Sequence, residues 1–483
     1  MKKKAMSIFG LVILCLSVFS CSKQQTTTTS STGPTSEPTI EEKLGELDRV
    51  KDLTYVTTTD DFEYVYNFCF EQYIDHTNKE LGTFTQKCEF GFNGFDAPNV
   101  LVTSGYYIYD DNYEYSSNEN EIAFLLHSNY IFVEHRYFGE SLPVEIDYYD
   151  VSTWDYLTTK QAADDVHDIY LEFSKILSGK WVASGISKGG ITATLYAYYY
   201  PGDMDLYVPY VAPFIDSIHD TRWVRYINEE IGDIYYGEEV AAEMRATVLQ
   251  FQVKLMEYKE ILAPLFFQDA LDSGVEVTEF LTPGIAYDMA VGDCGFAFWQ
   301  YYQHLYPYLK EIVDMPEESE EEITAKQEQF YVWISGLAAI NYGPNDPITP
   351  YFIQAYQELG ATAYDFSYIR AALGDRDLFS VQPEEEQDLF WRAIFNDGEL
   401  QLPRKELMAP YIEEMLRTTN DNFIIIYGSS DPFYSMRTAD VVGRPNISIY
   451  VDDQHAHQST IQTFDEETME EIINKIKTIL EIN

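Results

Sequence analysis

The chain has 483 residues, of which 80 are acidic and 31 are Lys or Arg, so its formal net charge is −49. Apolar residues make up 46% and aromatic residues 16%, which allows a large core and excludes a disordered acidic polymer. A negative field of this size repels phosphate backbones, so nucleic acid is excluded as a partner. The length favours two or three domains, or one or two if an α/β fold carries insertions.

The amino terminus has the pattern of a bacterial lipoprotein signal. Lys2, Lys3 and Lys4 precede an apolar stretch, residues 8–19, which is too short for a comfortable transmembrane helix. The stretch ends in Val18-Phe19-Ser20-Cys21, which resembles a lipobox. We expect a signal peptide over residues 1–20 and a diacylglycerol on Cys21. An ordinary signal peptide with an incidental cysteine is the alternative.

Residues 21–40 are rich in Thr, Ser and Pro and predict a low-complexity tether. With the lipid on Cys21 as the membrane anchor, we expect an exported bacterial lipoprotein of the cell envelope. The sequence leaves open whether the body faces the periplasm or the cell surface.

Two strand-like segments, residues 62–74 and 82–92, flank a turn-like Thr77-Asn78-Lys79-Glu80-Leu81. A simple hairpin centred on this turn places Cys69 and Cys88 opposite each other, within disulfide reach in an oxidising compartment. The sequence therefore predicts a Cys69–Cys88 disulfide, with two buried free thiols as the alternative.

Residues 180–201 have a strand–turn–helix pattern around a G-x-S-x-G-G motif, with Ser187 at its centre. Such a turn holds the serine hydroxyl exposed, and glycines flank it because a Cβ there would clash with the strand and helix. The pattern predicts Ser187 as a nucleophile. The N–H of Lys188 then lies at the helix start, aimed where an oxyanion would develop.

A long insertion separates this motif from the next strand-like run. Residues 214–405 are mostly helical in pattern and predict a cap, which leaves residues 41–213 and 406–483 as the catalytic core. A cap restricts entry, so it favours small substrates over folded proteins. The aromatic residues between 296 and 302 fit either the wall of a substrate pocket or a core stripe.

Asp431 is the predicted acid. The apolar run 423–427 reads as a buried strand, and Asp431 follows its end, where ligands gather in open α/β sheets. Asp440, Asp452 and Asp453 compete for this role, but none follows a strand end so directly.

The predicted base is a histidine after the next strand-like run, 447–451. His455 and His457 both lie on this loop, and either completes the order Ser, Asp, His that an α/β-hydrolase requires. The residues alone leave the two open. A metal site built on this H-x-H pair lacks a clear third ligand.

Several segments together resemble the secreted prolyl tri- and tetrapeptidyl aminopeptidases, serine peptidases of the α/β-hydrolase fold related to the lysosomal Pro-X carboxypeptidase. The S-K-G-G form of the serine motif and the preceding Glu134-His135-Arg136 are the most specific parts. The matching segments are 72–87, 99–106, 133–143, 154–170, 179–193, 204–213, 296–302 and 427–434.

The resemblance implies Ser187 as the nucleophile and Asp431 as the acid of a G-x-x-D-P motif. The base of the family has an apolar residue four positions on, which favours His457, with Ile461, over His455. Gln458 replaces the glycine that usually follows the base.

The loop after an early strand supplies the second oxyanion donor in this family, and the matching position is the N–H of Tyr106. Glu134-His135-Arg136 has two interpretations, a buried ion-pair cluster beneath the site or a wall of the substrate pocket.

The predicted fold is an α/β-hydrolase core with a mostly parallel sheet and a large helical cap. The resemblance implies a serine exopeptidase that releases tri- or tetrapeptides ending in Pro through an acyl-enzyme, without a metal or organic cofactor. Its partners are peptide substrates, and its oligomeric state stays open. The alternatives are an esterase or lipase on the same fold, or an inactive hydrolase-fold binding lipoprotein.

Overall fold

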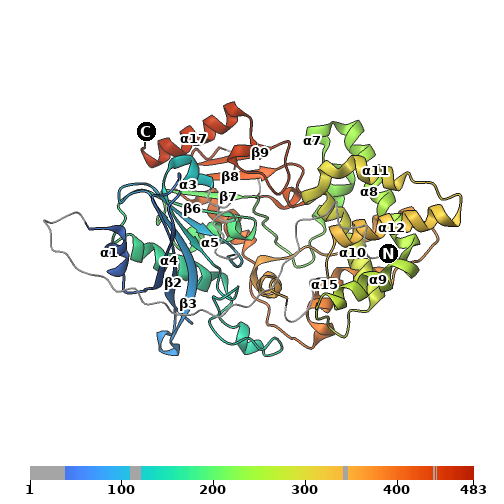
Figure 1. Cartoon of the computed structure of the whole chain (residues 1–483), viewed down its shortest axis with the longest axis horizontal. Coiled ribbons are helices and arrows are strands. Elements are labelled where there is room, and N and C mark those ends of the chain that lie inside the picture. The colour runs from blue at the N-terminus through green and yellow to red at the C-terminus, as the bar shows by residue number, and fades with distance from the viewer. Residues whose placement is uncertain (1–37, 109–120, 341–345, 439–440, 442, 483) are drawn as a thin grey trace. The chain divides into compact units, whose positions relative to one another are not determined.

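The computed structural model describes residues 38–108, 121–340, 346–438, 441 and 443–482 (Figure 1). The chain divides into two compact units, Met1–Glu46 and Leu47–Asn483. The described part of the first unit holds helix α1 (Ile40–Gly45), which begins with a capping box between Thr39 and Glu42.

The predicted signal peptide, Cys21 and residues 21–37 of the predicted tether lie outside the described residues. In the part of the chain that the structure describes, no helix is both long enough and apolar enough to span a membrane.

The second unit is built on a nine-stranded sheet in the order β1-β2-β3-β5-β4-β6-β7-β8-β9, counted over the described residues. The first strands pair antiparallel as far as β3–β5, and the pairs from β5–β4 to β8–β9 are parallel. The strands are β1 (Val50–Thr57), β2 (Tyr64–Tyr73), β3 (Thr83–Phe92), β4 (Asn99–Thr103), β5 (Asn129–Val133), β6 (Trp181–Ile186), β7 (Leu206–Tyr210), β8 (Phe423–Gly428) and β9 (Ile447–Asp452).

The parallel strands β4, β5, β7 and β8 are buried along their whole length. Parallel strands read as continuous apolar runs because helices cover both faces of the sheet. The helices of this core are α3 (Glu121–Leu126), α4 (Thr159–Phe173), α5 (Lys188–Tyr199) and α17 (Glu466–Leu480). Ile472, Ile476 and Leu480 of α17 pack into the main apolar core with residues of β6 to β8.

Between β7 and β8 the named elements of the described chain are all helices, and α7 to α12 gather beside one another (Figure 1). They are α6 (Arg222–Glu229), α7 (Asp233–Tyr236), α8 (Glu238–Glu257), α9 (Lys259–Asp272), α10 (Pro283–Ala297), α11 (Tyr306–Val313), α12 (Glu320–Leu337), α13 (Thr349–Gln354), α14 (Ser367–Leu373), α15 (Glu386–Ile394) and α16 (Ala409–Thr418). The predicted α/β-hydrolase fold with a helical insertion is confirmed. Insertion and sheet belong to the same compact unit, and the predicted domain limits at 213/214 and 405/406 stay predictions.

The predicted disulfide is wrong, because Cys69 and Cys88 are both free. β2 and β3 form the expected hairpin, but Cys88 lies opposite Phe68, and Cys69 lies opposite Lys87. The true register differs by one residue from a hairpin centred on the turn. Successive strand residues point to opposite faces, so this shift sends the two thiols to opposite faces of the sheet.

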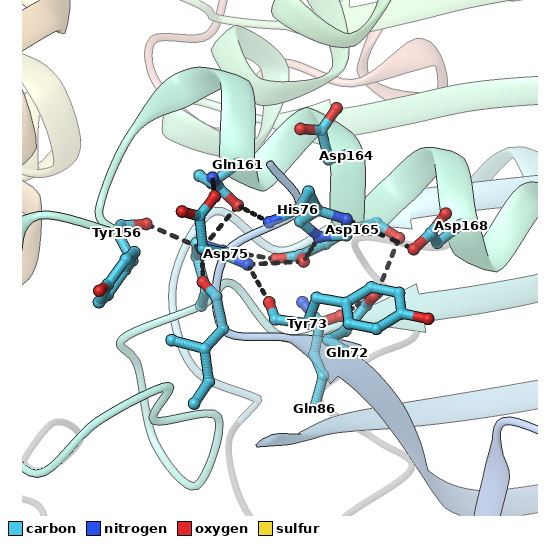
Figure 2. A network of polar contacts seen from close by, with 12 residues as sticks. Gln72, Tyr73, Asp75, His76, Gln86, Tyr156, Gln161, Asp164, Asp165 and Asp168 are labelled. Atoms are coloured by element: carbon cyan, nitrogen blue, oxygen red, sulfur yellow. Dashed lines mark hydrogen bonds and ion pairs between the residues drawn. The ribbon is translucent and has the colours of Figure 1, made fainter. Parts of the chain in front are cut away.

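Arg136 and Asp165 form the centre of a buried polar network. Arg136 is fully buried and donates from Nε and Nη2 to the two carboxylate oxygens of Asp165, at 2.7 and 2.8 Å. Figure 2 shows His76 pointing toward Asp165, with a distance of 2.7 Å between His76 Nε2 and Asp165 Oδ1. For Arg136 the contacts therefore support the buried ion-pair interpretation rather than a pocket wall.

We expect Asp165→Asn to lower the free energy of unfolding by about 3–5 kcal/mol, because it leaves the Arg136 guanidinium buried without a countercharge. Urea unfolding followed by circular dichroism measures this. Arg225→Ala removes exposed ion pairs with Glu229 and Glu230 and is the control, with an expected loss below about 1 kcal/mol per pair. An equal loss of unfolding free energy in the two variants would contradict the role assigned to the Arg136–Asp165 pair.

Candidate active site

Ser187 lies in a strained turn between β6 and α5. Its backbone has φ 56° and ψ −118°, a conformation that costs energy for any residue with a Cβ. The N–H of Ser187 donates to the Tyr210 carbonyl of the neighbouring strand at 2.8 Å, which holds the turn in place. The Ser187 side chain makes no capping hydrogen bond to the helix, so its hydroxyl is left for other partners.

The glycines of this motif are required by close backbone contacts. A Cβ on Gly189 would collide with the Thr103 carbonyl at the end of β4, and a Cβ on Gly185 would collide with Gly189 itself. A Cβ on Gly190 would press on Ala212. The helix therefore begins directly against the sheet, which is the geometry that a nucleophile elbow needs.

Asp431 and His457 form a buried pair at the ends of neighbouring strands. Asp431 follows β8, His457 follows β9, and Nδ1 of His457 lies 2.6 Å from Oδ2 of Asp431. The other carboxylate oxygen of Asp431 accepts from the N–H of Phe433 at 3.0 Å. With Nδ1 bound to the carboxylate, Nε2 is the ring nitrogen that can accept a proton from a nucleophile.

The structure places His455 elsewhere. Its Nδ1 lies 2.9 Å from Oδ2 of Asp452, three residues earlier, and its side chain is 42% exposed. The same carboxylate also accepts from the backbone N–H groups of Gln454 and His455, so this pair closes a local turn. Of the two histidines, His457 is the one brought to Asp431.

Gly428 explains how the loop reaches this position. A Cβ on Gly428 would collide with the carbonyl of Ala456 and crowd that of His455. The loop can therefore lie across the end of β8 because this residue has no side chain. In the described residues the structure has no hydrogen bond between Ser187 and His457, a contact that is often loose in enzymes without substrate.

The two predicted oxyanion donors lie on segments in direct contact. Gly105, between β4 and Tyr106, has φ 76°, and a Cβ there would collide with the backbone nitrogen of Gly189. Lys188 is the first residue of α5, where backbone N–H groups have no partner within the helix. The N–H of Tyr106 donates to Ser104 Oγ over a long 3.3 Å, so an oxyanion would have to displace or share this bond.

A cavity of about 300 Å³ is lined by residues that contact His457, although neither His457 nor Ser187 lines it. Phe433 and Gln300 line it, and both contact His457: the ring centroids of Phe433 and His457 are 5.5 Å apart, and the Gln300 carbonyl accepts from the His457 N–H. Tyr351, another lining residue, packs edge-on against Tyr106 with centroids 5.8 Å apart. The cavity is therefore one residue away from both the histidine and the predicted oxyanion loop.

The aromatic cluster at 296–302 divides between the core and the wall of the cavity, and the predicted substrate pocket stays a prediction. Phe298 and Trp299 are completely buried and belong to the core. Phe296 lines the cavity and packs against Phe433, and Tyr301 packs edge-on against His457 with ring centroids 5.7 Å apart.

Asp293, the acidic residue of the cavity wall, was not predicted from the sequence. Its carboxylate accepts hydrogen bonds from the hydroxyl of Tyr364 at 2.9 and 3.1 Å. It lies on α10 one helical turn before Phe296, so the two share a helix face. The only sequence signal for it is this spacing from the aromatic cluster.

With the elbow at the end of β6 and the Asp–His pair at the same edge of a mostly parallel sheet, the molecule falls into the α/β-hydrolase class of serine hydrolases. Within this class, the chain belongs to the PS-10 peptidase S37 family, whose model matches residues 48–451. The match ends before His455 and His457, so it does not choose between them.

Known proteins agree with this assignment. Prolyl tri/tetrapeptidyl aminopeptidase of Streptomyces mobaraensis is 26% identical over 365 residues, which cover 75% of this chain and 69% of that protein. Serine protease vicPa of Bipolaris victoriae is 35% identical over 105 residues, covering 20% of this chain and 19% of that protein. The protein is therefore a serine peptidase, and the expected family resemblance is confirmed.

Among solved structures, a proline iminopeptidase of Mycobacterium smegmatis matches with a TM-score of 0.36 at 12% identity, covering 89% of this chain and 99% of that one. A likeness this distant adds nothing to the assignment.

We expect His457→Ala to slow covalent labelling of Ser187 by a fluorophosphonate by at least about 10³-fold, since the nucleophile then lacks its base. His455→Ala is the matched control on the same loop and should label close to the wild-type rate. Labelling rates followed by mass spectrometry of the Ser187 peptide test this. Loss of labelling in His455→Ala alone would reverse the assignment.

Proposed function

We propose that the protein is an exported, lipid-anchored exopeptidase that releases short amino-terminal peptides, tri- or tetrapeptides ending in Pro. The observation that carries the substrate proposal is the cavity beside His457, with aromatic walls and a carboxylate set back from the histidine. The Streptomyces relative, a prolyl tri/tetrapeptidyl aminopeptidase, points the same way.

In the proposed mechanism the Ser187 oxygen attacks the scissile carbonyl while His457 takes the proton of the Ser187 hydroxyl. Asp431 orients the imidazole and stabilises its charged form. The N–H groups of Lys188 and Tyr106 stabilise the oxyanion, and His457 returns the proton to the leaving amine. A water molecule then attacks the acyl-enzyme while His457 takes a proton from it, and this proton returns to the Ser187 oxygen as the peptide is released.

The cavity suits a prolyl residue followed by a short extended peptide. Phe433 and Phe296 present ring faces and edges in contact with each other, a surface on which a pyrrolidine ring can pack. The volume of about 300 Å³ falls at the lower end of ligand pockets, so it accommodates a few residues rather than a long chain.

Asp293 is the proposed anchor for the free amino terminus of the substrate. It precedes Gln300, which contacts His457, by seven residues along one helical segment, or roughly 10 Å at 1.5 Å per residue. Three extended residues span about the same length. For a scissile bond held beside His457, this carboxylate therefore favours a substrate whose free ammonium group lies about three residues away.

We expect Ala-Ala-Pro-aminomethylcoumarin to be cleaved at least about 30-fold more efficiently, in kcat/KM, than its N-acetylated form, because acetylation removes the charge that Asp293 binds. Asp293→Asn should lose most of this preference while retaining the Ser187 labelling rate. The control is Asp314→Asn, an exposed acidic residue of the insertion, which should keep the preference.

Equal cleavage of the free and acetylated substrates would contradict amino-terminal anchoring. Retention of the preference in Asp293→Asn would reject this residue but not the exopeptidase. Turnover of short-chain nitrophenyl esters alone, with no peptide cleaved, would contradict the proposed substrate class.

The proposed export and lipid anchor rest on the lipobox-like residues before Cys21. We expect cells that express the full chain to incorporate an alkynyl fatty acid into this protein, and Cys21→Ser to abolish the label. Cys69→Ser is the control and should label fully. Equal labelling of Cys21→Ser would place the lipid elsewhere, and absence of label in the wild type would favour an ordinary signal peptide.

A further inference from the structure

The side chain of Lys188 is buried without a carboxylate partner. Lys188 is 1% exposed, and the hydrogen bond that the structure records for Nζ runs to the carbonyl oxygen of Gly105, at 2.6 Å. The ammonium lies over the rings of Tyr106 and Phe138, 5.6 and 5.1 Å from their centroids. Within the described residues it forms no ion pair, and burial lowers the pKa of Lys188 well below its usual value.

This arrangement is unfavourable for stability. A buried charge is normally paired, because one neutral acceptor and two ring faces do not replace its hydration. Lys326 in the insertion shows the usual solution: it is 3% exposed and donates to two carbonyls and to Glu317. The two buried lysines therefore differ in their partners: Lys326 binds a carboxylate, whereas the hydrogen bond of Lys188 runs to a backbone carbonyl.

The carbonyl that Lys188 binds belongs to the peptide whose N–H is the proposed second oxyanion donor. A trans peptide is planar, so its C=O and N–H point in opposite directions. A hydrogen bond that fixes the Gly105 carbonyl therefore also fixes the direction of the Tyr106 N–H. The hydrogen bond to the carbonyl also polarises the peptide and strengthens its N–H as a donor.

The same loop is held from its other side by the residues directly after β5. The N–H of His135 donates to the Tyr106 carbonyl at 2.9 Å, and Glu134 Oε1 accepts from the N–H of Ile108 at 2.9 Å. These bonds fix the loop after Tyr106. The Lys188 ammonium acts on the peptide before it.

We propose that Lys188 is a positioning residue of the oxyanion hole. Its side-chain nitrogen orients the Gly105–Tyr106 peptide, and its backbone N–H supplies the other oxyanion donor. One residue thereby aligns both donors with the hydroxyl of Ser187. This inference rests on the proposed peptidase mechanism.

The test is Lys188→Met, which keeps the apolar stem and removes the ammonium. We expect kcat on the tripeptidyl substrate to fall about 10- to 100-fold with KM within about 3-fold. The reason is that the Tyr106 N–H, misaligned in this variant, stabilises only the oxyanion of the transition state and not the bound substrate. The thermal midpoint should stay level or rise. Lys326→Met is the matched control, with a lowered thermal midpoint and unchanged kcat.

A wild-type measurement guards against a variant that does not fold. A peptide boronate forms a tetrahedral adduct on a nucleophilic serine, and in protein labelled with ¹⁵N-lysine its binding should shift the Lys188 ammonium resonance but not that of Lys326.

A folded Lys188→Met with kcat within about 3-fold of wild type would overturn the inference, as would an unshifted Lys188 resonance in the boronate complex. A wild type that neither reacts with a fluorophosphonate nor binds the boronate would instead overturn the proposed mechanism, and the role of Lys188 with it.

Discussion

The backbone contact between the end of β4 and the start of α5 is the constraint on which the rest of the site depends. Thr103, Gly105 and Gly189 approach so closely that a Cβ on either glycine would collide with the opposite backbone. This contact forces Ser187 into a positive φ and brings the loop of Tyr106 against the helix start. The nucleophile and both proposed oxyanion donors are therefore fixed by the same packing.

The acid–base pair depends on a second close approach at the same sheet edge. Gly428 lets the loop after β9 lie across the end of β8, which brings His457 to Asp431 while His455 turns back to Asp452. The insertion completes this arrangement, since Gln300 binds the His457 backbone and Tyr301 packs on its ring. These residues lie in a π-helical turn, a rare conformation that is often found at functional sites.

The sequence predicted the parts of this site that depend on local pattern. The strand–turn–helix around Ser187 and the strand before Asp431 follow from apolar runs and glycines close in sequence. The register of β2 and β3 did not follow, because a turn with a 3₁₀ segment (Lys79–Leu81) shifts the pairing by one residue, and a one-residue shift exchanges the faces of the sheet.

Long-range contacts were not predictable in the same way. From the residues alone His455 and His457 are equivalent, since the path of the loop over Gly428 decides between them. Asp293 has no distinguishing motif, and its place in the cavity wall depends on how α10 packs with α8, α9 and α12. The Lys188 side chain gave no signal either, since nothing near it in sequence shows that its ammonium meets the Gly105 carbonyl.

The exposed carboxylates behind the net charge of −49 and the carboxylate in the cavity wall have different effects on a cationic substrate. Exposed carboxylates attract any cation, but salt screens them within about 10 Å, so they give little positional information. A carboxylate in the wall of a cavity is screened less and is fixed in place by its hydrogen bonds, as Asp293 is by Tyr364. In the proposed function, the general acidity of the surface therefore draws peptide amino termini toward the protein, and a single carboxylate determines where along the peptide the chain is cut.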